Sequence, residues 1–168
     1  MAEIGADAGF DELAYRRALG GFGTGVALVA AWDGFGQAHG LIINSLTSVS
    51  LQPPVVLWCL GDQCAAFGVF TNCPSFSINI LGAEDEALAR RFSRRGDRLI
   101  PADQIRRMTT GAPVLAAAVA SLDCRVRSHE RVGDHEVIYG DVADYYAASS
   151  GDALGYFRGR YVKLSHEP

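Results

Sequence analysis

The sequence predicts a mainly β protein with a few helices, in which the strands form a closed antiparallel β-barrel. Six or seven apolar, strand-like runs follow one another, and turn residues separate them. Only two or three segments have helical character, and they are placed as crossings or caps. The 168 residues contain no internal repeat or linker, so we expect a single domain over residues 1–168.

The strands are predicted from short apolar or alternating runs bounded by Gly, Pro, Asn or Asp. Residues 75–81 (SFSINIL) alternate polar and apolar side chains, which is the period of a half-buried strand. Residues 111–132 read either as a strand pair or as two consecutive strands. The other predicted strands are residues 24–32, 39–44, 55–60, 133–147 and 155–164.

Two amphipathic helices are predicted. Residues 10–22 begin with an acidic turn, carry apolar side chains at helical spacing and end at a Gly-Gly pair. Residues 84–95 have acids in the first turn and arginines in the last, which complements the helix dipole.

The composition and net charge limit which classes of protein the chain can belong to. With 49% hydrophobic residues, 20% charged residues and a net charge of −4, the chain reads as globular, and attraction to nucleic-acid phosphates is disfavoured. The N-terminus lacks the layout of a signal peptide, and no apolar run is long enough to span a bilayer. We therefore expect a soluble, cytoplasmic protein without membrane contact.

The four cysteines form no C-x-x-C pair and lie far apart in the sequence. They are Cys59, Cys64, Cys73 and Cys124. This spacing offers no set of metal ligands, so we expect reduced thiols and no metal.

Residues 44–54 (NSLTSVSLQPP) form a predicted loop with many small hydrogen-bonding side chains between two apolar strands. Small side chains let a planar polar ligand approach the main chain, and the two prolines stiffen the exit from the loop. The alternative is that Ser, Thr and Asn only cap local turns. The loop by itself leaves both interpretations open.

A series of short motifs resembles one known family in order and spacing. They are T-G-V, N-S-x-x-S-V-S-L-x-P-P, N-I-L, R-F, G-x-P-V-L, C-R-V, G-D-H-x-x-x-x-G and G-x-Y. Over residues 10–164 this order is similar to the short-chain flavin reductases, the small components of two-component flavin-dependent monooxygenases. The resemblance implies a flavin-binding split barrel that binds FMN or FAD non-covalently, as a homodimer.

The resemblance also implies roles for individual residues at a flavin site. Thr24, Gly25 and Val26 would lie along the isoalloxazine ring. The ring edge and ribityl chain would be contacted by residues of the loop: Asn44, Ser45, Thr47, Ser48, Val49 and Ser50. Their neutral donors would tune the electron affinity of the ring.

The phosphate end of the flavin is less well defined by the resemblance. Gln63 and Cys64 stand where relatives offer Ser, Thr or Lys to the phosphate. Arg91 is a candidate phosphate partner, although it also suits a solvated helix end. Phe92 would pack at the flavin or, alternatively, in the core. Tyr161 resembles a late-strand tyrosine near the flavin.

His135 is the candidate catalytic residue. In the family this histidine lies beside the nicotinamide site, where it would orient NADH or NADPH; the alternative is a histidine that caps the start of a strand. The resemblance thus implies an NAD(P)H:flavin oxidoreductase that supplies reduced flavin to a separate oxygenase. Two alternatives stay open: a split-barrel flavoprotein with a tightly held flavin acting on another substrate, and a non-catalytic flavin- or haem-binding module.

Overall fold

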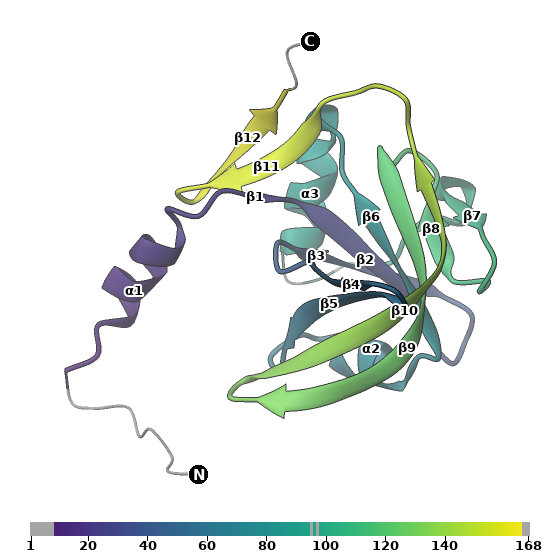
Figure 1. Cartoon of the computed structure of the whole chain (residues 1–168), viewed down its shortest axis with the longest axis horizontal. Helices are drawn as coiled ribbons and strands as arrows, with labels where there is room; N and C mark the ends of the chain where they lie inside the picture. Colours follow the sequence, from purple (N-terminus) through teal and green to yellow (C-terminus); the bar gives the residue numbers. More distant parts are fainter. Residues whose placement is uncertain (1–8, 95, 97, 166–168) are drawn as a thin grey trace.

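The computed structural model describes residues 9–94, 96 and 98–165, and its centre is a seven-stranded antiparallel sheet (Figure 1). The strands lie in the order β3-β2-β6-β9-β10-β5-β4. Their bounds are β2 Ala27–Trp32, β3 Ala38–Ile43, β4 Thr47–Leu51, β5 Pro54–Gly61, β6 Ser75–Ile80, β9 Ala120–Val132 and β10 His135–Ala147. The two longest strands, β9 and β10, form the central hairpin.

Two small sheets and three α-helices complete the described part of the chain. The first sheet has the order β1-β11-β12, with β1 Thr24–Gly25, β11 Ala153–Phe157 and β12 Arg160–Leu164; the second pairs β7 Ile105–Arg107 with β8 Pro113–Leu115. The α-helices are α1 Glu12–Leu19, α2 Phe67–Asn72 and α3 Glu86–Ser93, and two 3₁₀ turns cover Ala83–Asp85 and Ala102–Gln104. Among the described residues, no helix is long and apolar enough to cross a membrane.

The prediction of a mainly β chain is confirmed, but the predicted closure into a barrel is wrong. The strands β3 and β4 are the two edges of the seven-stranded sheet and do not pair. The outer edge of β3 is already used, because the Gly40 amide donates to the Arg98 carbonyl and the Ile100 amide to the Ala38 carbonyl, both at 2.8 Å. Residues 44–46 connect the two edges directly, so the open side of the sheet lies beside them.

Two apolar clusters pack against opposite faces of β2. Val29 and Ala31 join the first cluster, around Trp58 and Phe76, whereas Leu28 and Ala30 join the second, around Phe92. A strand buried on both faces requires a continuous apolar run, and ALVAAW supplies it.

Four buried polar side chains fix the β8 segment on the sheet. The Asn79 amide nitrogen donates to the Leu28 carbonyl at 3.0 Å, while its oxygen accepts from the Leu115 amide at 2.9 Å. Ser77, Ser121 and Asp123 are buried beside it and are also hydrogen-bonded. Because each polar group has a partner, this network can lie inside the fold without a large desolvation cost.

The structure refines several predicted elements. The predicted loop 44–54 contains strand β4, and the predicted strand 155–164 is a hairpin that turns at Arg158 and Gly159. Arg158 and Gly159 both have positive φ angles, of 47° and 79°, which is what a tight turn of this kind needs. Residues 111–132 form two consecutive strands, β8 and β9. Helix α2 was not predicted.

Candidate functional site

Three adjoining hollows meet beside the open side of the sheet, where β3 ends. All three are lined by Ile43 and Asn44, so they form one continuous recessed surface. Their volumes are ≈ 400, 370 and 570 Å³ respectively, within the range of ligand-binding clefts. The connection between β3 and β4 therefore lies where the three hollows meet.

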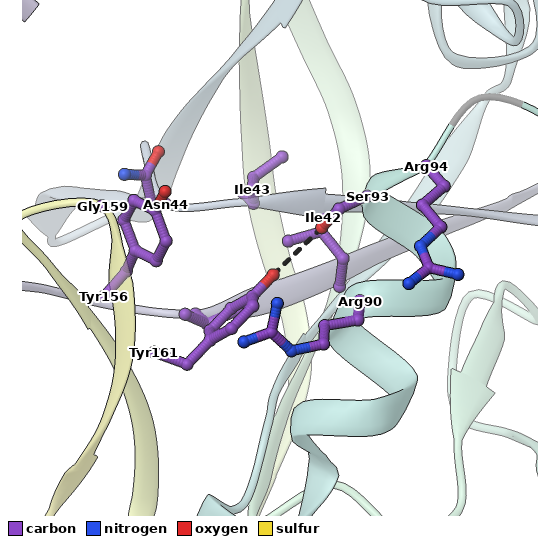
Figure 2. Close-up of a pocket in the computed structure, with 10 residues that line it drawn as sticks. Ile42, Ile43, Asn44, Arg90, Ser93, Arg94, Tyr156, Gly159 and Tyr161 are labelled. Atoms are coloured by element: carbon purple, nitrogen blue, oxygen red, sulfur yellow. Dashed lines mark hydrogen bonds between the residues drawn. The ribbon is translucent and has the colours of Figure 1, made fainter.

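The first hollow, here called the arginine hollow, lies between helix α3 and the β11–β12 hairpin (Figure 2). The Ser93 and Tyr161 hydroxyls are hydrogen-bonded at 3.0 Å, and the Tyr156 and Tyr161 rings meet edge-on with centroids 5.4 Å apart. Arg90 and Arg94, at the end of α3, also line this hollow. The hollow thus combines aromatic surface with positive charge.

The second hollow, here called the histidine hollow, lies where β5 ends and β10 begins. His135 Nδ1 lies 2.7 Å from Asp134 Oδ1, and this hydrogen bond is the main reason that the pKa of Asp134 is lowered. Because the carboxylate accepts from Nδ1, the neutral imidazole carries its proton there and leaves Nε2 available to a ligand. Asp62, Gln63, Cys59 and Cys64 line the rest of this hollow.

The third hollow, here called the neutral hollow, lies between β1 and the connection 44–46. Its lining residues are Leu19, Phe22, Gly23, Thr24, Gly25, Val26, Ala27, Ile43, Asn44, Ser45, Leu46, Thr47 and Ile80. None of these side chains is ionisable. The Thr24 hydroxyl is buried and has no hydrogen-bond partner within the described structure, which is costly unless a ligand satisfies it.

Ten of the predicted site residues line these hollows. They are Thr24, Gly25, Val26, Asn44, Ser45, Thr47, Gln63, Cys64, His135 and Tyr161. The Ser45 hydroxyl also accepts a 3.0 Å hydrogen bond from the Cys59 amide, which fixes the connection against β5.

The other five predicted residues line none of the three hollows. Ser48, Val49 and Ser50 lie on the edge strand β4. Phe92 is completely buried in the second core cluster, where it packs against Gly40. Arg91 donates from Nη2 to the Leu99 carbonyl at 3.0 Å, at the back of helix α3.

Sequence reasoning missed most of the arginine hollow, including its polar and aromatic residues Arg90, Ser93, Arg94 and Tyr156. The spacing of Arg90 and Arg94 was a usable signal, because residues four apart lie on the same face of a helix. Tyr156 pairs with Tyr161 across the hairpin, a contact that the Arg-Gly turn between them could have indicated. No metal-binding group of three or more His, Cys, Asp or Glu side chains occurs in the part of the chain that the structure describes.

Comparison with known proteins places the chain in a family. The flavin reductase like domain family matches residues 19–165. The actinorhodin polyketide dimerase of Streptomyces coelicolor is 34% identical over 92% of this chain and 87% of its own, and an FMN reductase (NADH) of Methylorubrum extorquens is 34% identical over 99% and 83%. The structure of the styrene monooxygenase flavin reductase from Pseudomonas putida S12 superimposes with a TM-score of 0.82 at 28% identity, covering 92% of this chain and 99% of its own. The chain belongs to the flavin reductase like domain family.

Proposed function

We propose that this protein is an NAD(P)H:flavin oxidoreductase that reduces FMN or FAD and supplies reduced flavin to a separate oxygenase. The family membership supports this function, and so do the names of two relatives, an FMN reductase (NADH) and the flavin reductase of styrene monooxygenase. Residues 10–164 act together as one flavin reductase domain.

The observation that carries the proposal is the neutral hollow with its unsatisfied Thr24 hydroxyl. An isoalloxazine ring has apolar faces and an edge of uncharged carbonyl and nitrogen acceptors. Apolar side chains, the Asn44 amide and the Thr24 and Thr47 hydroxyls offer complementary contacts without a charged group. The residues present therefore fit a flavin ring.

The chemistry needs positioning rather than acid–base groups from the protein. The bound flavin supplies the hydride acceptor, and NAD(P)H supplies the hydride. The role of the chain is to hold the flavin ring and the nicotinamide ring at contact distance. Thr24 and Asn44 hold the flavin ring, and His135 holds the nicotinamide. His135 is suited to the nicotinamide because it lines the histidine hollow together with Asn44, while Asp134 holds its Nδ1.

A His135→Ala variant tests this role. We expect KM for NADH to rise about tenfold, with flavin affinity changed less than about twofold, because the variant removes one orienting hydrogen bond from the nicotinamide side only. His129→Ala is a matched control, since His129 is also hydrogen-bonded to a carboxylate, Glu136 at 3.1 Å, but lines none of the three hollows. NADH kinetics equal to those of the parent would remove His135 from the mechanism.

The deciding experiment for the function is the oxidation of NADH and NADPH with free FMN, FAD or riboflavin at varied concentration. A reductase that treats flavin as a substrate gives a rate that saturates with added flavin. The second candidate, an enzyme with tightly held flavin that acts on another substrate, is favoured by the likeness to the actinorhodin polyketide dimerase. In that case the purified protein would carry flavin, and its rate would be indifferent to added flavin.

The active form is proposed to be a homodimer. Helix α1 stands away from the body of the molecule (Figure 1) and has no buried residue. Leu13 and Leu19 are 59% and 55% exposed. An eight-residue helix is not stable in water on its own, so a packing partner is required, and a second copy of this chain is the simplest one.

A further inference from the structure

Positive charge is distributed unevenly over the three joined hollows. The neutral hollow has no ionisable side chain, and the histidine hollow has, besides His135, the carboxylates of Asp134 and of Asp62, which is paired with Arg131 at 2.8 Å. Of these three hollows, as the structure describes them, the arginine hollow alone is lined by guanidinium groups. NADH and FAD each carry a diphosphate, and two negative phosphates are favoured where the guanidinium groups lie rather than beside the Asp134 carboxylate.

The two arginines of this hollow differ in how far they are already engaged. Arg90 donates to Glu86 at 2.7 Å, and its guanidinium lies 5.1 Å from the centroid of the Tyr161 ring. Arg94 follows the last turn of α3 and is exposed, and its side chain has no hydrogen bond or ion pair with any described residue. In Figure 2 Arg94 lies at the end of α3, on the side of the helix away from Tyr161 in this view, and it belongs to the lining of the hollow. Of the two, Arg94 is therefore the arginine whose guanidinium has no partner among the described residues, and it is the one that we assign to phosphate.

The opposite side of the same hollow offers surface for a base. Tyr156 and Tyr161 form an edge-on pair, and Gly159, in the turn between them, also lines the hollow. Aromatic rings of this kind stack on purines, and such stacking contributes about 1–3 kcal/mol per base. Ser93 and Asn44 add a hydroxyl and an amide group to the lining of the hollow.

From this arrangement we infer that the arginine hollow binds the ADP moiety that NADH and FAD share, with Arg94 on the diphosphate and the tyrosine pair beside the adenine. This inference rests on the proposed function, because it assigns different parts of the flavin and NAD(P)H molecules to the three hollows. The flavin ring then occupies the neutral hollow and the nicotinamide the histidine hollow. Tyr161 serves the adenine rather than the flavin ring.

Direct titration tests the hollow without requiring turnover. Isothermal titration calorimetry with ADP is carried out on the parent, Arg94→Gln and Arg125→Gln; Arg125 is an exposed arginine on β9 that lines none of the three hollows. Loss of one ionic hydrogen bond to phosphate weakens ADP binding about tenfold or more in Arg94→Gln. Arg125→Gln binds like the parent, and riboflavin, which lacks phosphate, binds all three proteins equally. Arg94→Lys retains part of the affinity because the charge remains.

Steady-state kinetics then identify which nucleotide provides the ADP. If the KM of Arg94→Gln rises for NADH but not for reduced nicotinamide mononucleotide, the hollow holds the ADP of NADH. If it rises for FAD but not for riboflavin, the hollow holds the ADP of FAD. Failure of the proposed function would appear as no NAD(P)H oxidation by the parent with any flavin, and the ADP titration would still be interpretable. A parent that does not bind ADP, or an Arg94→Gln variant that binds it as the parent does, would overturn the inference and leave Arg94 as a complement to the helix dipole.

Discussion

At the scale of single residues, Thr24 matters because it lines the neutral hollow and its buried hydroxyl has no hydrogen-bond partner among the described residues. Thr24→Val keeps the shape and removes the hydroxyl. We expect the ligand-free protein to be more stable by about 1 kcal/mol, because an unpaired polar group no longer has to be buried. Flavin affinity should fall about fivefold, because the ring loses one hydrogen bond. Urea unfolding without ligand and flavin fluorescence titration measure the two effects.

Thr71→Val is the matched control for this prediction. The Thr71 hydroxyl donates to the Phe67 carbonyl at 3.0 Å within α2, so its removal should lower stability slightly and leave flavin affinity unchanged. If Thr24→Val instead lost stability and bound flavin like the parent, the Thr24 hydroxyl would have a structural role. The main reason for placing the flavin ring in the neutral hollow would then be removed.

At the scale of elements, the connection between β3 and β4 is held by one side chain. Strand β4 pairs with β5 only from Leu57 to Pro54. Cys59 therefore has no partner on β4, and its amide donates to the Ser45 hydroxyl instead. Ser45→Ala should lower the free energy of unfolding by about 1–2 kcal/mol, since a partly buried amide loses its acceptor. Denaturant unfolding checks this value. Ser48→Ala, at an exposed position of β4, should change stability by less than about 0.5 kcal/mol, and equal losses in the two variants would contradict the role given to Ser45.

The sequence predicted most elements because their apolar periods are clear. The alternation in SFSINIL became β6, and the acid-to-arginine gradient of residues 84–95 became α3. It did not predict β4, because serine and threonine suit both a loop and an exposed edge strand, and only the pairing with β5 decides between them. The candidate site, too, was predicted only in part. The polar residues around Asn44 converge, whereas Arg91 and Phe92 point elsewhere because the turn of α3 places Arg90 and Arg94 in the hollow.

At the scale of the whole molecule, the open side of the sheet explains why binding residues come from distant parts of the sequence. Residues 98–100 use the free edge of β3, so β4 cannot close the ladder and the short connection between the edges stays recessed. The β11–β12 hairpin, helix α3 and the start of β10 each reach this connection from a different side. A nucleotide bound there would contact elements that no local sequence pattern links.

We expect helix α1 to join two copies of the chain. Leu13→Glu places a charge on an apolar side chain that is 59% exposed in one chain and would be buried in the proposed homodimer. Because an unpaired charge in an interface is strongly unfavourable, we expect light scattering to show about half the mass of the parent at micromolar concentration. Glu12→Gln, a charge change on the same helix that leaves the apolar side chains intact, should remain dimeric. A parent that is already monomeric, or a Leu13→Glu variant of unchanged mass, would show that α1 does not join two copies of the chain.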